Sequence, residues 1–407
     1  SVKKVSELKL RLSAGNTGNQ GIAPYSSISQ IAPYRYNFSN TNTQGYAPNS
    51  VNNQGLGWEK TFQVDLGLDL GLLNNRILLT ADYYYKKTTA LLLNAPVPGT
   101  SGLSYYDPNN NLSQASTVYQ NVGEVENKGI ELALNTRTIA TKRFNWNTLF
   151  IFSKNSNKIL SLGGLDQIIP NISLPSVLQV GAPVGSFYVY QTDGIIQENE
   201  AGPKALTPQA NKSAGGQKYK DINGDGKITQ SGDRVLIKNN PGVNLGLTNT
   251  FSFKTNAGTI DLTIFLQSVQ GAKLYNNNRA TLELNTGYYN GSKTALNRYT
   301  PTNTNTDVKE AYQEPSVTIS DRYIEDASYV RLKNVSLGYT LPQVWTSKAK
   351  LTNVRIYFSI QNYKTWTKYT GFDPEASANG QSQIYRGIDN GVYPNYKTIL
   401  GGLSLSF

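Results

Sequence analysis

Residues 62–72, FQVDLGLDLGL, decide the fold, because apolar and other side chains alternate along them without interruption. Successive side chains of a β-strand point to opposite faces, so this period of two predicts a strand. Carboxylates and glycines on one face and aliphatic side chains on the other fit a wall between water and lipid. The apolar face consists of Phe62, Val64, Leu66, Leu68, Leu70 and Leu72. The polar face consists of Gln63, Asp65, Gly67, Asp69 and Gly71.

The same alternation recurs in residues 77–86, 260–267 and 354–361. A soluble β-sandwich also alternates, but its strands cluster near five or six residues, whereas the runs here extend over about 10–18. A bilayer crossing needs about 9–11 tilted residues. Tyr and Trp stand near the ends of several runs, as they do in interfacial girdles. We therefore predict an all-β protein, an antiparallel transmembrane β-barrel with long extracellular loops.

The spanning strands are expected near 7–15, 58–72, 76–93, 118–138, 144–160, 243–254, 259–275, 324–341, 353–367 and 397–407. Short and long links alternate between them, and outer-membrane barrels have short periplasmic turns and long extracellular loops. Residues 184–196 also have a strand pattern, but a crossing there would turn the short links outward. We therefore place them in a large extracellular loop insertion, 163–242, within one barrel domain that covers 1–407.

The composition excludes most enzyme chemistry. Without His or Cys, the chain has no imidazole base, thiolate nucleophile, disulfide or zinc-thiolate site. A carboxylate pair could still hydrolyse glycosides, but the spacing arranges no such pair, so we predict that the chain is not an enzyme. The formal net charge of +11 comes from scattered Lys and Arg. This pattern is typical of dispersed surface charge and not of a nucleic-acid partner. The same charge would attract lipid and lipopolysaccharide as partners.

Four stretches spread over nearly the whole chain carry a family resemblance: residues 8–20 (LKLRLSAGNTGNQ), 121–131 (NVGEVENKGIE), 218–228 (KYKDINGDGKI) and 327–339 (ASYVRLKNVSLGY). In this order they resemble the C-terminal portion of SusC/RagA-type TonB-dependent outer-membrane transporters. The resemblance implies a barrel of about 22 strands, of which about ten lie in this chain. The chain contains no Met, so we expect it to be part of a longer protein.

The resemblance also implies a function and partners. A transporter of this type imports a large nutrient, an oligosaccharide or a peptide, across the bacterial outer membrane. The partners would be the remainder of the barrel and its plug, a SusD-like surface lipoprotein, and TonB through the N-terminal part that this chain lacks. The alternative is a passive porin or structural outer-membrane β-barrel without a plug.

Residues 221–226, DINGDG, match the start of a calcium loop, which places oxygen ligands at positions one, three and five. The usual carboxylate at position twelve is replaced by Gly232. A tight turn without metal explains the same residues. The candidate Ca²⁺ ligands are Asp221, Asn223, Asp225, Lys227 through its carbonyl, and Asp233.

The predicted extracellular loops contain aromatic and guanidinium groups that could hold a sugar or a peptide. Packing among the loops or against a partner protein explains the same groups. The candidate substrate-binding residues are Tyr288, Tyr289, Arg298, Tyr299, Tyr385, Arg386 and Tyr393. On the polar face of the wall, Asp65, Asp69, Asp82 and Asp261 are expected to lie in water.

Overall fold

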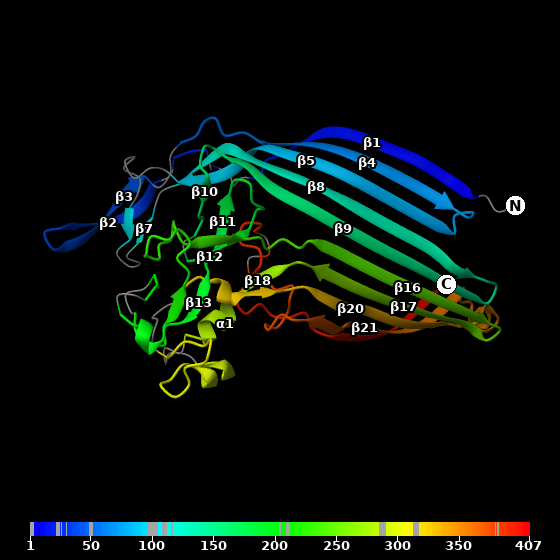
Figure 1. The fold of residues 1–407 in the computed structure, drawn as a ribbon. Coiled ribbons are helices and arrows are strands. Elements are labelled where there is room, and N and C mark those ends of the chain that lie inside the picture. The colour runs from blue at the N-terminus through cyan, green and yellow to red at the C-terminus, as the bar shows by residue number, and fades with distance from the viewer. Residues whose placement is uncertain are drawn as a thin grey trace.

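The computed structural model describes residues 4–21, 25, 27–29, 31–48, 52–96, 105–107, 112–114, 117–171, 173–202, 205–208, 212–284, 290–311, 317–378, 380 and 382–407. Figure 1 shows a long, curved wall of strands with a group of loops at one end, which we call the loop end. The first wall strand begins and the last one ends at the opposite end, the turn end. In the described part of the chain, no helix is long and apolar enough to span a membrane.

The wall is one antiparallel sheet of ten strands, in the order β1-β4-β5-β8-β9-β16-β17-β20-β21-β23. Each of the ten predicted strand ranges overlaps one strand of this sheet. Within the described residues the sheet is open, and β1 and β23 are its edges. The strand bounds are β1 Val5–Asn19, β4 Glu59–Leu72, β5 Ile77–Pro96, β8 Thr117–Ala140, β9 Phe144–Leu162, β16 Val243–Thr255, β17 Gly258–Gln270, β20 Tyr329–Thr340, β21 Asn353–Thr367 and β23 Thr398–Ser406.

The register aligns the apolar side chains into rows across the wall. Leu68 of β4 lies opposite Leu10 of β1 and Ala81 of β5. The row continues from Ala81 to Leu132 of β8 and then to Phe152 of β9. A slip of one residue would turn every side chain of a strand to the other face, so the alternation in the sequence is compatible with this register and excludes a one-residue slip.

Tight turns join strands at the turn end. Between β4 and β5, Leu73, Asn74 and Asn75 have φ angles of 55°, 56° and 60°. This left-handed conformation is one that Asn tolerates, because its short side chain can bond locally to the backbone. Between β16 and β17, Gly258 has a φ of +131°, a backbone conformation that would be strained in any residue with a side chain. The chain thus reverses within a few residues and keeps adjacent strands paired.

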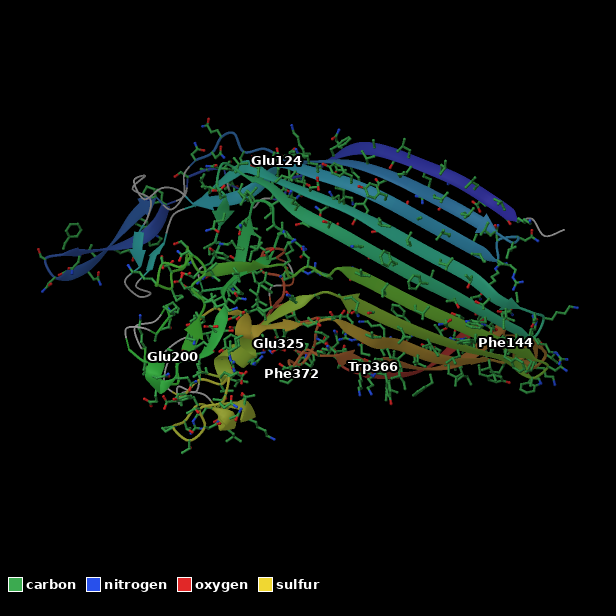
Figure 2. All side chains as sticks on the ribbon, in the orientation of Figure 1. Glu124, Phe144, Glu200, Glu325, Trp366 and Phe372 are labelled. Carbon is green, nitrogen blue, oxygen red and sulfur yellow. The ribbon has the colours of Figure 1, made fainter. Side chains whose placement is uncertain are left out.

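The loop end carries the remaining elements. Figure 2 places Glu200, Glu325 and Phe372 there, and Phe144 of β9 at the turn end.

Residues 184–196 form strands outside the ten-stranded sheet, as predicted. The strands of the 163–242 segment are β10 Gln167–Ile168, β11 Ser176–Gln179, β12 Ser186–Tyr190, β13 Thr192–Ile195, β14 Gln217–Tyr219 and β15 Arg234–Ile237. The others are β2 Ile31–Phe38, β3 Thr41–Pro48, β6 Tyr105–Asp107, β7 Leu112–Gln114, β18 Lys273–Asn276, β19 Ile324–Asp326 and β22 Ile388–Asp389, with helix α1 Asn277–Leu282. A second short helix, α2 Gln343–Thr346, lies between β20 and β21 at the turn end.

Two predicted strands are shorter in the wall than expected. The prediction of one strand over 259–275 is corrected to β17 and β18, and that over 324–341 to β19 and β20. Gly271 has a φ of +79° and ends the wall ladder after β17. Beyond it, β18 pairs with β19 and β22 in a separate sheet. This small sheet packs into the buried cluster that includes Phe187, Tyr275 and Ile388.

An arginine on the polar face is neutralised within the wall. Arg11 of β1 lies 2.9 Å from Asp69 and 2.8 Å from Asp82. Gly67 lies between these residues in the strand register. A Cβ atom at Gly67 would stand 2.5 Å from Asp82 Oδ1 and 2.6 Å from the central carbon of the guanidinium. Because Gly67 has no side chain, the guanidinium of Arg11 has room to reach the carboxylate of Asp82.

The same arrangement occurs on the far side of the wall. Arg355 of β21 binds Asp261 of β17 at 2.6 Å, and the two side chains meet over Gly338 of β20, which is opposite Asp261 in the strand register. A Cβ atom at Gly338 would stand 2.6 Å from Asp261 Oδ1. Three of the four polar-face aspartates are therefore paired inside the wall, where water alone was expected.

The two faces of β8 provide a test of the wall, to be made in the full-length protein. Leu132→Lys places a charge on the apolar face and should cost about 2–4 kcal/mol if the site is near the bilayer midplane. Ala133→Lys places the same charge on the polar face and should be nearly silent. The yield of heat-modifiable barrel in outer membranes measures the difference, and equal losses for both variants would refute the assignment of the faces.

Candidate functional site

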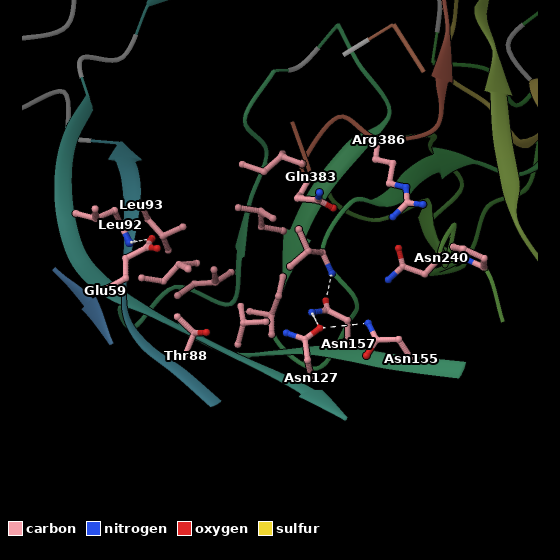
Figure 3. Close-up of a pocket in the computed structure, with 18 of the residues that line it drawn as sticks. Glu59, Thr88, Leu92, Leu93, Asn127, Asn155, Asn157, Asn240, Gln383 and Arg386 are labelled. Atoms are coloured by element: carbon pink, nitrogen blue, oxygen red, sulfur yellow. Dashed lines mark hydrogen bonds between the residues drawn. The ribbon is translucent and has the colours of Figure 1, made fainter. Parts of the chain in front are cut away.

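A cavity of about 560 Å³ opens where the polar face of the wall meets the loops (Figure 3), and we call it the mouth cavity. Strands β4, β5, β8, β9 and β16 supply its wall side, and residues from the segments 163–242 and 368–397 supply its loop side. Its volume lies within the range of about 300–1,000 Å³ that is usual for ligand sites. It is the candidate functional site.

One half of the mouth cavity is aliphatic. At the loop end, Leu93, Val125 and Ile159 of the wall are buried in a cluster with loop residues. The backbone fixes this packing, because the Ile159 N–H donates to the carbonyl of Ala182 at 2.8 Å and the Gly181 N–H donates to the carbonyl of Ile159 at 2.8 Å. The aliphatic half consists of Leu91, Leu92, Leu93, Val125, Ile159, Leu162, Leu178, Val184, Pro241 and Ile384.

The other half of the cavity carries amides. Asn127 Oδ1 accepts hydrogen bonds from Asn157 Nδ2 at 2.9 Å and from Asn155 Nδ2 at 3.4 Å. Asn157 Oδ1 accepts one from the backbone N–H of Val184 at 2.8 Å. These bonds fix the direction of the wall amides and tie them to the loop. The amide half consists of Asn127, Asn155, Asn157, Asn240, Asn244 and Gln383, with Glu59, Thr88 and Arg386 beside them.

The segment 368–397, which brings Arg386 to the cavity, is held on the wall by a buried arginine. Arg331 of β20 is 2% exposed. Its Nη2 donates to Asp373 Oδ1 at 2.6 Å, and its Nη1 donates to Glu375 Oε2 at 2.5 Å. Charge-assisted bonds of this kind are roughly twice as strong as neutral ones. The loop thus returns to the wall at a defined place, and this fixes the loop side of the cavity.

Asp373 also receives backbone hydrogen bonds, from Glu375 at 2.9 Å and Asn395 at 3.0 Å. Burial raises the pKa of Asp373, but these donors and the Arg331 guanidinium together lower that pKa by more, so it lies below its ordinary value. The carboxylate is therefore charged at neutral pH. This cluster was not predicted from the sequence, where its signal was two carboxylates around Pro374 in a long loop and an arginine within a wall strand.

Three predicted substrate-binding residues lie in the last loop. Arg386 is exposed and lines the mouth cavity. Tyr385 is half-buried against the cluster around Phe187, and its burial raises the pKa of its hydroxyl. Tyr393 is 83% exposed and does not line the cavity.

The other predicted substrate-binding residues come from an earlier loop. Tyr299 is only 2% exposed and packs close to Gly215. Arg298 Nη1 donates to the backbone carbonyl of Ala295 at 3.2 Å. Neither residue lines the mouth cavity. Tyr288 and Tyr289 lie outside the described residues.

The predicted calcium loop folds as a chain of tight turns. The carboxylate of Asp221 accepts backbone hydrogen bonds from Gly224 at 2.7 Å, Asp225 at 3.2 Å and Gly226 at 2.7 Å. The φ angles of Gly224 and Gly226 are +76° and +78°, which is why glycine suits both positions. Asp225 in turn accepts a bond from the Lys227 N–H at 2.8 Å and one from Asn223 Nδ2 at 3.1 Å.

Asp233 lies beneath this loop and is fully buried. It accepts hydrogen bonds from the N–H groups of Ile222 at 2.8 Å and Thr229 at 2.7 Å. Burial raises the pKa of Asp233, but the backbone donors lower it by more. In the part of the chain that is described, no three His, Cys, Asp or Glu side chains are grouped to hold a metal ion. The structure gives these carboxylates a turn-stabilising role, and calcium binding stays a prediction.

The family described as TonB dependent receptor-like, beta-barrel matches residues 5–363. The chain belongs to this family. It is 35% identical to TonB-dependent receptor P3 of Formosa agariphila over 416 residues, which cover 99% of the chain and 40% of that protein. It is 31% identical to TonB-dependent receptor SusC of Bacteroides thetaiotaomicron over 429 residues, which cover 100% of the chain and 38% of that protein.

A solved structure agrees with these matches. The structure of the RagAB peptide transporter superposes on the whole chain with a TM-score of 0.78 and 27% sequence identity, and the match covers 42% of that structure's chain. The predicted resemblance to a portion of a SusC/RagA-type barrel is therefore confirmed. The chain spans about 40% of the length of the curated relatives that it matches.

Family membership confirms one further prediction and agrees with another. The TonB-dependent receptor family consists of transporters and receptors, so the prediction that the chain is not an enzyme is confirmed. Barrels of this family lie in the outer membrane, and the apolar face of the wall is consistent with that location.

The arginine cluster predicts how the last loop is held. In the full-length protein, Arg331→Met should leave Asp373 as an uncompensated buried charge, at a cost of about 3–5 kcal/mol. We expect protease cleavage within 368–397 to accelerate while the wall stays folded. Arg137→Met, at an exposed arginine near the turn end, is the control. Unchanged protection of the loop in the Arg331 variant would show that the cluster does not hold it.

Calcium binding by residues 221–233 can be tested separately. After treatment of the full-length protein with EDTA, adding Ca²⁺ should slow protease cleavage in this loop, and Asp225→Ala should abolish that effect. Mg²⁺ serves as the control ion, because it prefers a stricter octahedral site with retained waters. Cleavage rates that do not change with Ca²⁺ would refute the calcium site.

Proposed function

We propose that this chain forms part of a TonB-dependent importer that carries a large nutrient, an oligosaccharide or a peptide, across the outer membrane. The observation that supports it most is the mouth cavity, which lies on the polar face of a wall that resembles the RagAB peptide transporter over its whole length. The amide half of the cavity and Arg386 offer hydrogen-bonding groups to a solute, which a purely structural wall would not require.

The orientation follows from the lengths of the links. Short periplasmic turns and long extracellular loops are the rule in outer-membrane barrels, so the turn end would face the periplasm and the loop end the exterior. The mouth cavity would then meet a nutrient at the outer surface. A SusD-like lipoprotein would cover the loop end, and the remainder of the barrel with its plug would close the wall between β1 and β23. TonB would act through the plug.

Purification from native outer membrane tests this function. The full-length protein, solubilised in detergent, should co-purify with a lipoprotein, and cells should take up its nutrient only when TonB is present. Uptake of labelled peptide and glycan mixtures by cells with and without TonB measures the dependence. Equal uptake in both, together with steady ion conductance through the purified barrel, would replace this proposal with the passive porin.

A further inference from the structure

We infer that the mouth cavity takes a segment of peptide with an aliphatic side chain, and that its nutrient is therefore a peptide and not an oligosaccharide. This inference rests on the proposed import function. It is carried by the chemistry of the cavity lining, which is divided into an aliphatic half and an amide half.

The division matches the two chemical parts of a peptide. A peptide backbone presents N–H donors and C=O acceptors at regular intervals, and a carboxamide can meet both, since it carries one carbonyl oxygen and two N–H donors. Asn127, Asn155 and Asn157 lie side by side on the wall in fixed directions, because they are hydrogen-bonded to one another. An aliphatic side chain of the same peptide would point away from them and enter the cluster that contains Leu93, Ile159 and Leu178.

An oligosaccharide fits this lining poorly. Its hydroxyl groups project all around each ring, so hydroxyls turned toward the aliphatic half would lose water without gaining a partner, which is costly. Sugar rings are commonly held by the faces of aromatic side chains. No aromatic side chain lines the mouth cavity among the residues that the structure describes. A group of aromatic side chains at the loop end, including Tyr275 and Tyr323, is buried in a separate cluster.

Charged and amide groups at the cavity margin are available to a ligand. In the described part of the chain, no partner approaches the side chains of Asn240, Gln383 and Arg386. Figure 3 shows Arg386 and Asn240 on one side of the cavity and Glu59 on the other. Glu59 is already engaged, by the Leu92 N–H at 3.0 Å and by Asn19 Nδ2 at 2.7 Å. Arg386 is thus the free charge, and its guanidinium fits a carboxylate of the peptide.

The experiment uses the full-length transporter purified with its partner lipoprotein. A tryptic digest of casein and a hydrolysate of starch are offered together, and the retained molecules are identified by mass spectrometry. We expect retained peptides enriched in Leu, Ile and Val. Ile384→Asn should reduce that enrichment about tenfold, as the loss of an apolar contact does. Leu296→Asn, at a residue 82% exposed on another loop, is the matched control and should change nothing.

The role of Arg386 has its own readout. Arg386→Gln should weaken the retention of peptides with a free C-terminus about tenfold, and that of C-terminally amidated peptides much less, if the carboxylate is the terminal one. An equal loss for both forms would assign the guanidinium to an acidic side chain instead. Arg137→Gln is the control, and the yield of heat-modifiable barrel shows that each variant has folded.

The outcomes separate the two proposals. Retention of starch fragments without peptides, in a protein whose uptake still depends on TonB, would overturn the peptide inference and leave the import function intact. Uptake that does not depend on TonB for either mixture would overturn the import function. Peptide retention that Ile384→Asn does not alter would show that peptides bind outside the mouth cavity, and would also overturn the inference.

Discussion

The hydrogen bonding of the wall backbone is the constraint on which the rest of this structure depends. In lipid, no water satisfies an exposed N–H or C=O group, so each strand between β1 and β23 must be paired along both of its sides. Once the backbone of a strand is paired along both sides, only its side chains distinguish one face of the sheet from the other. The alternation of apolar and polar side chains along each strand, such as Leu68 and Asp69 of β4, follows from this. Irregular backbone is confined to the two ends of the wall.

Charged side chains are paired near solvent on the polar face of the wall, but they are paired in buried networks at the loop end. On the polar face, Arg11 is paired with carboxylates across the strands in a setting that is partly open to solvent. At the loop end, Glu283 is 1% exposed and accepts bonds from Arg279 at 2.8 Å and Arg322 at 2.9 Å. A buried charge is costly without a partner, so such a network holds its segments in one arrangement more than it adds net stability. The Arg331 cluster does the same for the loop that carries Arg386, and the cavity therefore has a defined shape.

The mouth cavity brings together residues whose individual roles are ordinary. Asn127 and Asn157 belong to wall strands, Val184 to the largest loop, and Arg386 to the last one. Each is a minor feature of its own segment. Their combined chemistry, with amides facing an aliphatic surface, exists only because two loops fold back onto the loop end of the wall.

The sequence by itself determined where the ten wall strands lie and which side chains share a face, because an unbroken period of two is a local pattern that lipid enforces on every strand alike. Four motifs spread along the chain determined the family. It also placed residues 184–196 in a loop, through the lengths of the links. It did not reveal where Gly271 turns the chain off the wall, that Tyr299 is buried, or that Arg331 binds Asp373. Only the tertiary structure decided these, because contacts between loops distant in the sequence have no periodicity, and their geometry depends on which surfaces the wall brings together.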